Sequence, residues 1–504
     1  MKKLLTHLIL LAVVAALPIV AAAQTGTLPR TSPEQQGISS AAVARFIDSL
    51  MAVKSTHIHH VMVVRHGTVV AEVHPAPFRA SDVHTLYSES KTFTCMAVGL
   101  AVDEGKIKLD DKVVKFFPDK LPANVSTELK AMTVRDLLTM RSGIKPDWVM
   151  RNWSTDWMRI WLGKPVVEPG KKFQYDSMCT FMLSAIVQRA TGHTVLELLK
   201  QRLFGPMGIT VADWEQSPDG VNTGGWGLRL QAESQAKLGI LLLNGGKWQG
   251  KQLISRKWVE EATAKQVDFG QADKPATDGN QGYGFQLWRG KWPGSYRADG
   301  AYGQFIVCVP EVDLVVVING LSYRGDDEMA CVWRQLMPGI SKNPLAPNAA
   351  SARALRSAIS RAKLPMLKGQ RVGMVPPANG QVLPATGGLS SVKPIATGKS
   401  MRLVVRYADF EATDTIALGF GSWARTTLKG RTPYSIQAQS RFKGLTLPLR
   451  VAGNYAWLSP TKLVVQLYYV NMISRRLLTF DFKNHTLTVW DSFDHTKHHK
   501  VAWK

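Results

Sequence analysis

A serine followed three residues later by a lysine is the first pattern in this chain that could support chemistry. On a helix these two side chains lie one turn apart on the same face, and a neutral lysine can take the proton of a serine hydroxyl. Ser88 and Lys91 have this spacing. The same spacing recurs elsewhere in the chain, for example at Ser142/Lys145, Ser360/Lys363, Ser390/Lys393, Ser440/Lys443 and Ser459/Lys462. The surrounding sequence therefore has to decide between the pairs.

The residues after Ser88 have the pattern of a buried helix. One face of this helix is mostly apolar and contains Lys91, Phe93 and Met96. The helix should end at residues 103–105, Asp-Glu-Gly. A charged amine is disfavoured here by burial, by the free N–H groups of the first turn and by the helix dipole. The pKa of Lys91 should therefore fall toward neutral pH. The five other pairs named above lie in glycine- or proline-flanked or strand-like segments. We therefore predict Ser88 as nucleophile and Lys91 as its base; the alternative is a helix cap followed by an exposed lysine.

This helix must pack against strands, and the sequence predicts strands in two distant regions of the chain. Residues 61–70 are typical of two strands around a His-Gly turn, and residues 303–309 and 314–318 are typical of a second pair. The chain between these regions is mostly helical by its period, for example over 129–141. Strands at both ends with helices between them predict one α/β unit, over residues 24–345.

The rest of the chain predicts a second domain. Residues 343–348 break the pattern, and we predict a linker over 346–374 followed by an all-β domain, sandwich or barrel, over 375–504. The chain has a net charge of +24, and from residue 346 onward 23 Lys and Arg stand against 6 Asp and Glu. This basic domain could contact an anionic surface, or its charge is a solvated face. The sequence has no nucleic-acid-binding motif, so no nucleic-acid partner is expected.

The first 23 residues are typical of a secretory signal peptide. Lys2 and Lys3 precede an apolar run over 4–20, and three alanines end at Ala23. An uncleaved membrane anchor is the alternative, but Pro18 and the alanines favour cleavage. No cysteine follows the cleavage site, which argues against a lipoprotein anchor. We predict an exported protein, periplasmic or extracellular.

Cysteines and histidines do not form a metal-binding pattern. The four cysteines lie in apolar segments and are expected to be buried free thiols: Cys95, Cys179, Cys308 and Cys331. Two histidine clusters lack carboxylate or thiol partners at ligand spacing and are expected at the surface: His57, His59 and His60, and His495, His498 and His499. The sequence implies no metal and no organic cofactor.

Several segments resemble, in order, the class C β-lactamases and their relatives in the penicillin-recognising serine hydrolase superfamily. Residues 84–94 resemble the family's first motif, and residues 101–113, 133–143 and 203–209 resemble its continuation. The resemblance covers about residues 32–325, and the 6-aminohexanoate-dimer hydrolase-like enzymes are nearest in character. It implies an α+β fold: an antiparallel sheet flanked by helices plus an all-α lobe, with the site between them. The predicted all-β domain lies outside the resemblance.

The second family motif, Tyr-x-Asn, is similar to the segment around Tyr175. The resemblance implies that the Tyr175 hydroxyl relays the proton to the leaving group and later activates water. Ser177 stands where the motif has asparagine. Because that asparagine helps to hold the substrate amide, the change argues against a β-lactam substrate.

The third motif, Lys-Thr-Gly or His-x-Gly, aligns with residues 298–300, Ala-Asp-Gly. Its cation is missing, which argues against a substrate carboxylate at this point. We expect Ser177, Asp299 and Gly300 to contact substrate, with Gly300 allowing close approach of the backbone. The resemblance implies an oxyanion hole formed by the N–H groups of Ser88 and Ala301.

Together these observations predict an exported serine hydrolase that cleaves a small amide or ester through an acyl-enzyme on Ser88. Two alternatives stay open. One is a β-lactamase or cell-wall DD-peptidase, and the other is a non-catalytic binding protein whose basic C-terminal domain does the work. The sequence predicts no oligomeric state.

Overall fold

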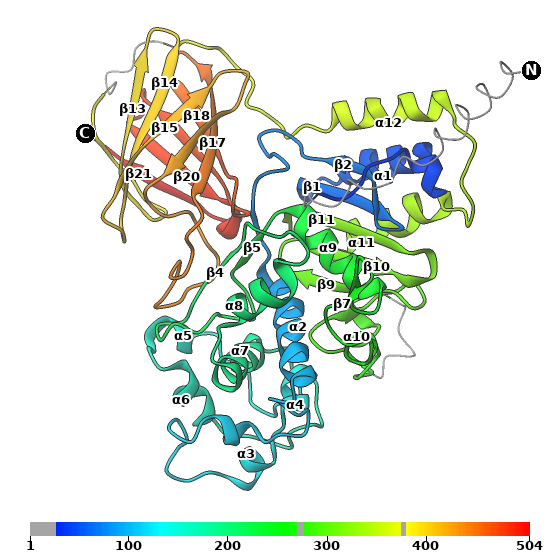
Figure 1. The fold of residues 1–504 in the computed structure, drawn as a ribbon. Helices are drawn as coiled ribbons and strands as arrows, with labels where there is room; N and C mark the ends of the chain where they lie inside the picture. Colours follow the sequence, from blue (N-terminus) through cyan, green and yellow to red (C-terminus); the bar gives the residue numbers. More distant parts are fainter. Residues whose placement is uncertain (1–26, 270–276, 374–379, 504) are drawn as a thin grey trace, which may run out of the picture.

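The computed structural model describes residues 27–269, 277–373 and 380–503. Figure 1 shows a helix-covered sheet, a helical lobe below it and a β-rich domain beside it. The predicted signal peptide, residues 1–23, lies outside the described residues. Within the described ranges, no helix combines the length and apolar character needed to span a bilayer.

The central sheet joins the two strand pairs that the sequence predicts. It is antiparallel, with strand order β2-β1-β11-β10-β9-β8. The strands are β1 (Thr56–Arg65), β2 (Thr68–Val73), β8 (Trp288–Arg289), β9 (Tyr296–Gly300), β10 (Gln304–Val309) and β11 (Leu314–Ser322). The early strand β1 pairs with the late strand β11, with Val63 opposite Val316. The sheet therefore closes only when both ends of the domain are in place.

Helices cover both faces of the sheet, which is why its strands are almost continuously apolar. One face packs against α1 (Ser40–Ala52), α11 (Asp326–Cys331) and α12 (Ala349–Arg361). The other face packs against α2 (Ser90–Asp103), α9 (Ala232–Leu243) and α10 (Arg256–Thr263). Every α2 residue from Ser90 to Ala101 is buried, so this helix runs through the core and not along its surface.

The all-α lobe is built from short helices. They are α3 (Thr127–Ala131), α4 (Val134–Leu138), α5 (Met150–Trp153), α6 (Trp157–Leu162), α7 (Ser177–Thr191) and α8 (Val195–Leu199). The single helix predicted over 129–141 is wrong, because the chain forms α3 and α4 there. Thr133 begins α4 with a capping box in which its side chain and that of Asp136 bond each other's backbone N–H. The periodicity of apolar residues does not reveal where one helix ends and the next begins when the boundary lies inside an apolar stretch.

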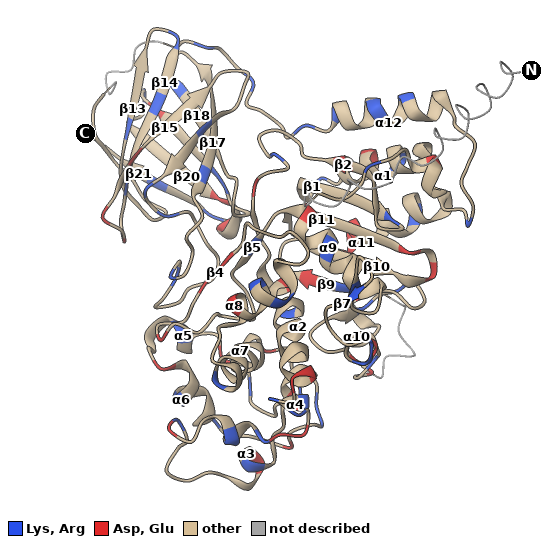
Figure 2. Cartoon of the chain, in the orientation of Figure 1, with Lys and Arg blue, Asp and Glu red and all other residues tan. Residues whose placement is uncertain are grey.

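The C-terminal region is β-rich, as the sequence predicts. Its ten strands form one sheet in the order β12-β13-β14-β15-β17-β18-β19-β20-β21, with β16 paired to β17. The bounds are β12 (Leu383–Pro384), β13 (Leu389–Thr397), β14 (Ser400–Tyr407), β15 (Thr413–Gly419), β16 (Ala424–Leu428), β17 (Leu449–Ser459), β18 (Lys462–Tyr469), β19 (Arg475–Asp481), β20 (Thr486–Asp491) and β21 (His498–Ala502). In Figure 2, Lys and Arg are distributed over many strands and loops of this domain.

The segment predicted as a linker contains the helix α12. Leu355 and Ala358 bury their side chains in the core on the α1 side of the sheet. Arg361 Nη2 lies 2.8 Å from Asp48 Oδ2 on α1. Much of the chain between the two domains is therefore fixed on the first one.

The cysteine prediction is confirmed, and the histidine prediction is partly wrong. All four cysteines are buried, and none is paired in the described part of the chain. His495 and His498 are exposed, as expected. His59 and His60 have an exposed fraction of 0%, because the loop after β2 folds over β1 and stacks Phe78 on the His59 ring at 3.9 Å. Among the described residues, no group of His, Cys, Asp or Glu is arranged to hold a metal ion.

Candidate active site

Ser88 lies in a tight turn at the start of the buried helix. A short 3-10 turn, Tyr87–Glu89, leads into α2, and Ser88 is partly exposed whereas Lys91 is 1% exposed. Tyr87 has a φ of +48°, which is unusual for a residue with a side chain. The turn is held by β5 (Leu228–Leu230), since Leu86 N–H donates to Leu228 O at 2.9 Å. Backbone strain is thus located one residue before Ser88.

The amine of Lys91 has three hydrogen-bond acceptors. Nζ lies 2.9 Å from Ser88 Oγ, 2.8 Å from Ser177 Oγ and 2.8 Å from the Gly225 carbonyl oxygen. Burial lowers the pKa of Lys91 to about 7; the charge of Arg151 acts in the same direction, and Asp176 opposes it. A neutral amine has two N–H groups and one lone pair. If Ser177 and Gly225 take the N–H groups, the lone pair is directed at the Ser88 hydroxyl.

Tyr175 stands on the other side of Ser88. Its hydroxyl interacts with the Ser88 side chain, and its ring centroid lies 4.8 Å from Lys91 Nζ. Burial raises the pKa of Tyr175, so the phenol keeps its proton at neutral pH. Asp176 positions the segment, because its Oδ1 accepts the N–H of Met178 at 2.9 Å and caps α7. The geometry brings Ser88, Lys91, Tyr175 and Ser177 together.

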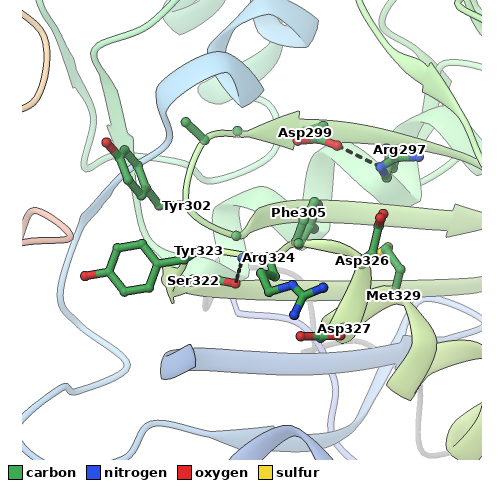
Figure 3. A pocket seen from close by; sticks show the side chains of 14 residues that line it. Arg297, Asp299, Tyr302, Phe305, Ser322, Tyr323, Arg324, Asp326, Asp327 and Met329 are labelled. Atoms are coloured by element: carbon green, nitrogen blue, oxygen red, sulfur yellow. Dashed lines mark hydrogen bonds and ion pairs between the residues drawn. The ribbon is translucent and has the colours of Figure 1, made fainter. Parts of the chain in front are cut away.

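The end of β9 forms the opposite wall. A Cβ built on Gly300 would lie 2.2 Å from the carbonyl oxygen of Leu86, so only glycine fits beside the turn that contains Ser88. Asp299 Oδ2 accepts from Arg297 Nε at 2.9 Å. Ala301 begins the turn to β10, beside a cavity of about 570 Å³. Figure 3 shows Asp299 and Arg297 on β9 along this cavity, with Tyr302 and Tyr323 at one end.

Two charged residues of the site were not singled out from the sequence. Glu89 is fully buried, and neither of its carboxylate oxygens has a hydrogen-bond partner among the described residues. Burial and the nearby Asp299 raise the pKa of Glu89 well above its usual value. Arg151 lies over the Trp226 ring at 4.5 Å. The position of Glu89 next to Ser88 was a usable signal, but Arg151 has no sequence signal.

Aromatic rings form the wall behind Tyr175. Its ring lies 5.5 Å from the ring of Trp288 and 6.4 Å from that of Tyr283. Phe173 and Phe269 extend this wall, with their centroids 4.8 Å apart. The wall is apolar and partly exposed, so it offers an apolar chain or ring a surface next to Tyr175.

The chain is similar to known proteins over the region that contains this site. Residues 33–330 match the Beta-lactamase family. The chain is 27% identical over 316 residues to a 6-aminohexanoate-dimer hydrolase of Paenarthrobacter ureafaciens, covering 57% of this chain and 79% of the relative. It is 25% identical over 148 residues to penicillin-binding protein 4* of Bacillus subtilis, covering 26% of this chain and 31% of the relative.

A solved penicillin-binding protein homologue from Caulobacter crescentus superposes with a TM-score of 0.48 at 17% identity, over 59% of this chain and 97% of that one. The family match covers more than half of the sequence and includes the turn with Ser88, helix α2, Tyr175 and the end of β9. The chain therefore belongs to the Beta-lactamase family of serine hydrolases.

Proposed function

We propose that this protein hydrolyses a small amide or ester through an acyl-enzyme on Ser88, with Lys91 as general base and Tyr175 as proton relay. The observation that carries the proposal is the position of the Lys91 amine, 2.9 Å from Ser88 Oγ, in a setting that lowers its pKa to about 7. At neutral pH a large fraction of this amine is uncharged and can accept the serine proton.

The first half of the reaction forms the acyl-enzyme. Ser88 Oγ attacks the substrate carbonyl carbon while its proton passes to Lys91 Nζ. The N–H groups of Ser88 and Ala301 then stabilise the negative oxygen of the tetrahedral intermediate, each donor contributing about 3–4 kcal/mol in comparable sites. As the intermediate collapses, the bond to the leaving amine or alcohol breaks, and that group takes a proton relayed through Tyr175.

The second half releases the acid. Water attacks the ester carbonyl of the acyl-enzyme and passes a proton toward Tyr175 and Lys91. The bond to Ser88 Oγ then breaks, and the serine regains its proton. The raised pKa of Tyr175 suits this part, because a phenol that keeps its proton can donate it and recover it within one cycle.

The substrate class follows from the walls of the site. Ser177 and Ala298 stand where the family motifs have an amide and a cation, and the next residue, Asp299, places a carboxylate beside the cleft, paired with Arg297. An anionic substrate end is therefore disfavoured at this point. The aromatic wall around Trp288 suits an apolar chain, and the similarity to a 6-aminohexanoate-dimer hydrolase supports a linear amide.

A fluorophosphonate probe followed by peptide mass spectrometry tests the nucleophile, with Ser88→Ala as control. We expect labelling at Ser88 in the wild type and its loss in Lys91→Met. A folded wild type that is not labelled refutes the proposal. A parallel panel of p-nitrophenyl esters, short linear amides and nitrocefin tests the substrate class, and rapid turnover of nitrocefin alone would make the protein a β-lactamase instead.

We also propose that the protein is exported, on the pattern of residues 1–23. Fractionation of cells that produce the full chain, with mass spectrometry of its N-terminus, tests this. We expect a mature chain beginning at Gln24 outside the cytoplasm, and an intact N-terminus in the cytoplasmic fraction would contradict it.

A further inference from the structure

One segment of the C-terminal domain lies against the catalytic domain. Residues 429–448, between β16 and β17, are called here the docking segment; Figure 1 shows the orange chain reaching down beside β4 (Asp213–Trp214). The N–H groups of Thr446 and Leu447 donate to Asp213 Oδ2 at 2.7 and 2.8 Å. The carbonyl oxygen of Leu447 accepts from Arg229 Nη2 at 2.8 Å.

Asp213 and Arg229, which bind the docking segment, are both buried, so the segment is bound to a rigid part of the catalytic domain. The side chains of Arg229 and Asp213 are 0% and 2% exposed and form an ion pair with each other. Further along the segment, the carbonyl oxygen of Lys443 accepts the N–H of Gln216 at 2.8 Å. A contact that joins backbone to backbone in this way fixes the position of the chain itself, not only that of its side chains.

The middle of the docking segment reaches the nucleophile turn. The Oγ of Ser435 lies 3.0 Å from the hydroxyl oxygen of Tyr87, the residue before Ser88. The Tyr87 ring packs edge-on between the rings of Tyr302 and Tyr434, each at 5.6 Å. Tyr87 is 3% exposed and has a positive φ, so its conformation depends on what surrounds it.

The same segment also touches the loop that holds Lys91. The Tyr434 hydroxyl donates to Glu215 Oε2 at 3.2 Å. The backbone of Glu215 pairs with Gly227, two residues after the Gly225 carbonyl that accepts from Lys91. A Cβ on Gly227 would lie 2.5 Å from the Glu215 Cβ, so these two residues pack too closely for a larger side chain at position 227.

We propose that Ser435, in the C-terminal domain, is a positioning residue for the hydrolase site. Its hydroxyl holds Tyr87, and through Tyr87 it fixes both the Oγ and the backbone N–H of Ser88. The C-terminal domain then completes the active site of the first domain. The inference rests on the proposed role of Ser88, and it goes beyond it, because a residue about 350 positions later in the sequence sets the geometry of the nucleophile.

The test uses the full-length chain with Ser435→Ala, Ser435→Thr and Tyr87→Phe. We expect kcat for a p-nitrophenyl ester to fall about tenfold in Ser435→Ala, the effect of one lost buried hydrogen bond, with KM unchanged. Tyr87→Phe should show the same loss, and the double variant should show no further loss, since both remove one interaction. Ser435→Thr keeps a hydroxyl and should restore kcat.

A matched control removes a different contact of the docking segment. The Lys443 amine donates to the carbonyl oxygen of Pro218, away from Tyr87, so Lys443→Ala should leave kcat unchanged. Equal losses in Lys443→Ala and Ser435→Ala, a loss confined to KM, or wild-type kcat in a folded Ser435→Ala would each overturn the inference. In that case fluorophosphonate still labels Ser88 in the wild type. An unlabelled wild type overturns the proposed function, and this inference with it.

Discussion

Replacing Ser177 by alanine tests the proposed role of Lys91 as a base. In the native site the amine bonds Ser177, Gly225 and Ser88, and its pKa lies near 7. A hydrogen bond from a charged ammonium contributes about 2 kcal/mol and one from a neutral amine about 1 kcal/mol. The variant therefore destabilises the charged form by about 1 kcal/mol more than the neutral form, which lowers the pKa of Lys91 by about 0.7, to about 6.3.

The assay is the pH dependence of kcat/KM for a p-nitrophenyl ester between about pH 5 and about pH 9, which reports the ionisation of the free enzyme. We expect the acid limb of Ser177→Ala to lie about 0.7 below that of the wild type. The plateau should fall about tenfold, because the freed N–H lets the lone pair turn away from Ser88.

The matched control is Ser184→Ala, another buried serine of α7, whose Oγ donates to the Asn222 carbonyl at 2.7 Å and does not contact Lys91. Its profile should match that of the wild type. An acid limb of Ser177→Ala that moves upward, or a profile identical to that of the wild type, would refute the reasoning.

Three further outcomes follow from single features. Gly300→Ala should lower kcat about 100-fold, because its Cβ would meet a backbone oxygen at 2.2 Å. Gly279→Ala should be neutral, because a Cβ there would meet only Thr277 Oγ1, at 3.8 Å; equal activity of the two variants contradicts this. Burial lowers the pKa of His84 from 6.5 to about 4, so the stability that neutral His84 contributes is complete above pH 6.5 and is lost as the pH falls toward 4. In urea unfolding the loss should be about 3 kcal/mol, and an identical pH dependence in His84→Gln would argue against this role. Arg229→Met leaves Asp213 buried without its cation and should cost about 3–5 kcal/mol of unfolding free energy, a change below about 1 kcal/mol being incompatible with a buried pair.

The helix that follows Ser88 could be predicted because its signals are local. The apolar face after Ser88 and the spacing to Lys91 are properties of a dozen consecutive residues, and the structure places both side chains within hydrogen-bond distance. The union of early and late strands in one sheet was also predictable, since each strand pair was strongly apolar and only a common sheet covers both.

The partners of these residues were not predictable, because they come from loops without a pattern. The Gly225 carbonyl, the Arg151 charge and the Ser435 hydroxyl reach the site from three unrelated segments. The prediction that His59 and His60 lie at the surface was wrong for the same reason. Alternation along β1 says which residues share a face, but not that a loop with Phe78 covers that face.

The pairing of β1 with β11 has a consequence for synthesis of the protein on the ribosome. Val63 meets Val316 only after about 250 further residues have been made, so one edge of the first hairpin stays unpaired for about half of translation. A chain that stops before residue 314 lacks β11, the strand that lies between β1 and β10 in the sheet. Such a fragment would expose an apolar strand edge, and a chaperone that shields nascent chains would have to cover it until the last strand arrives.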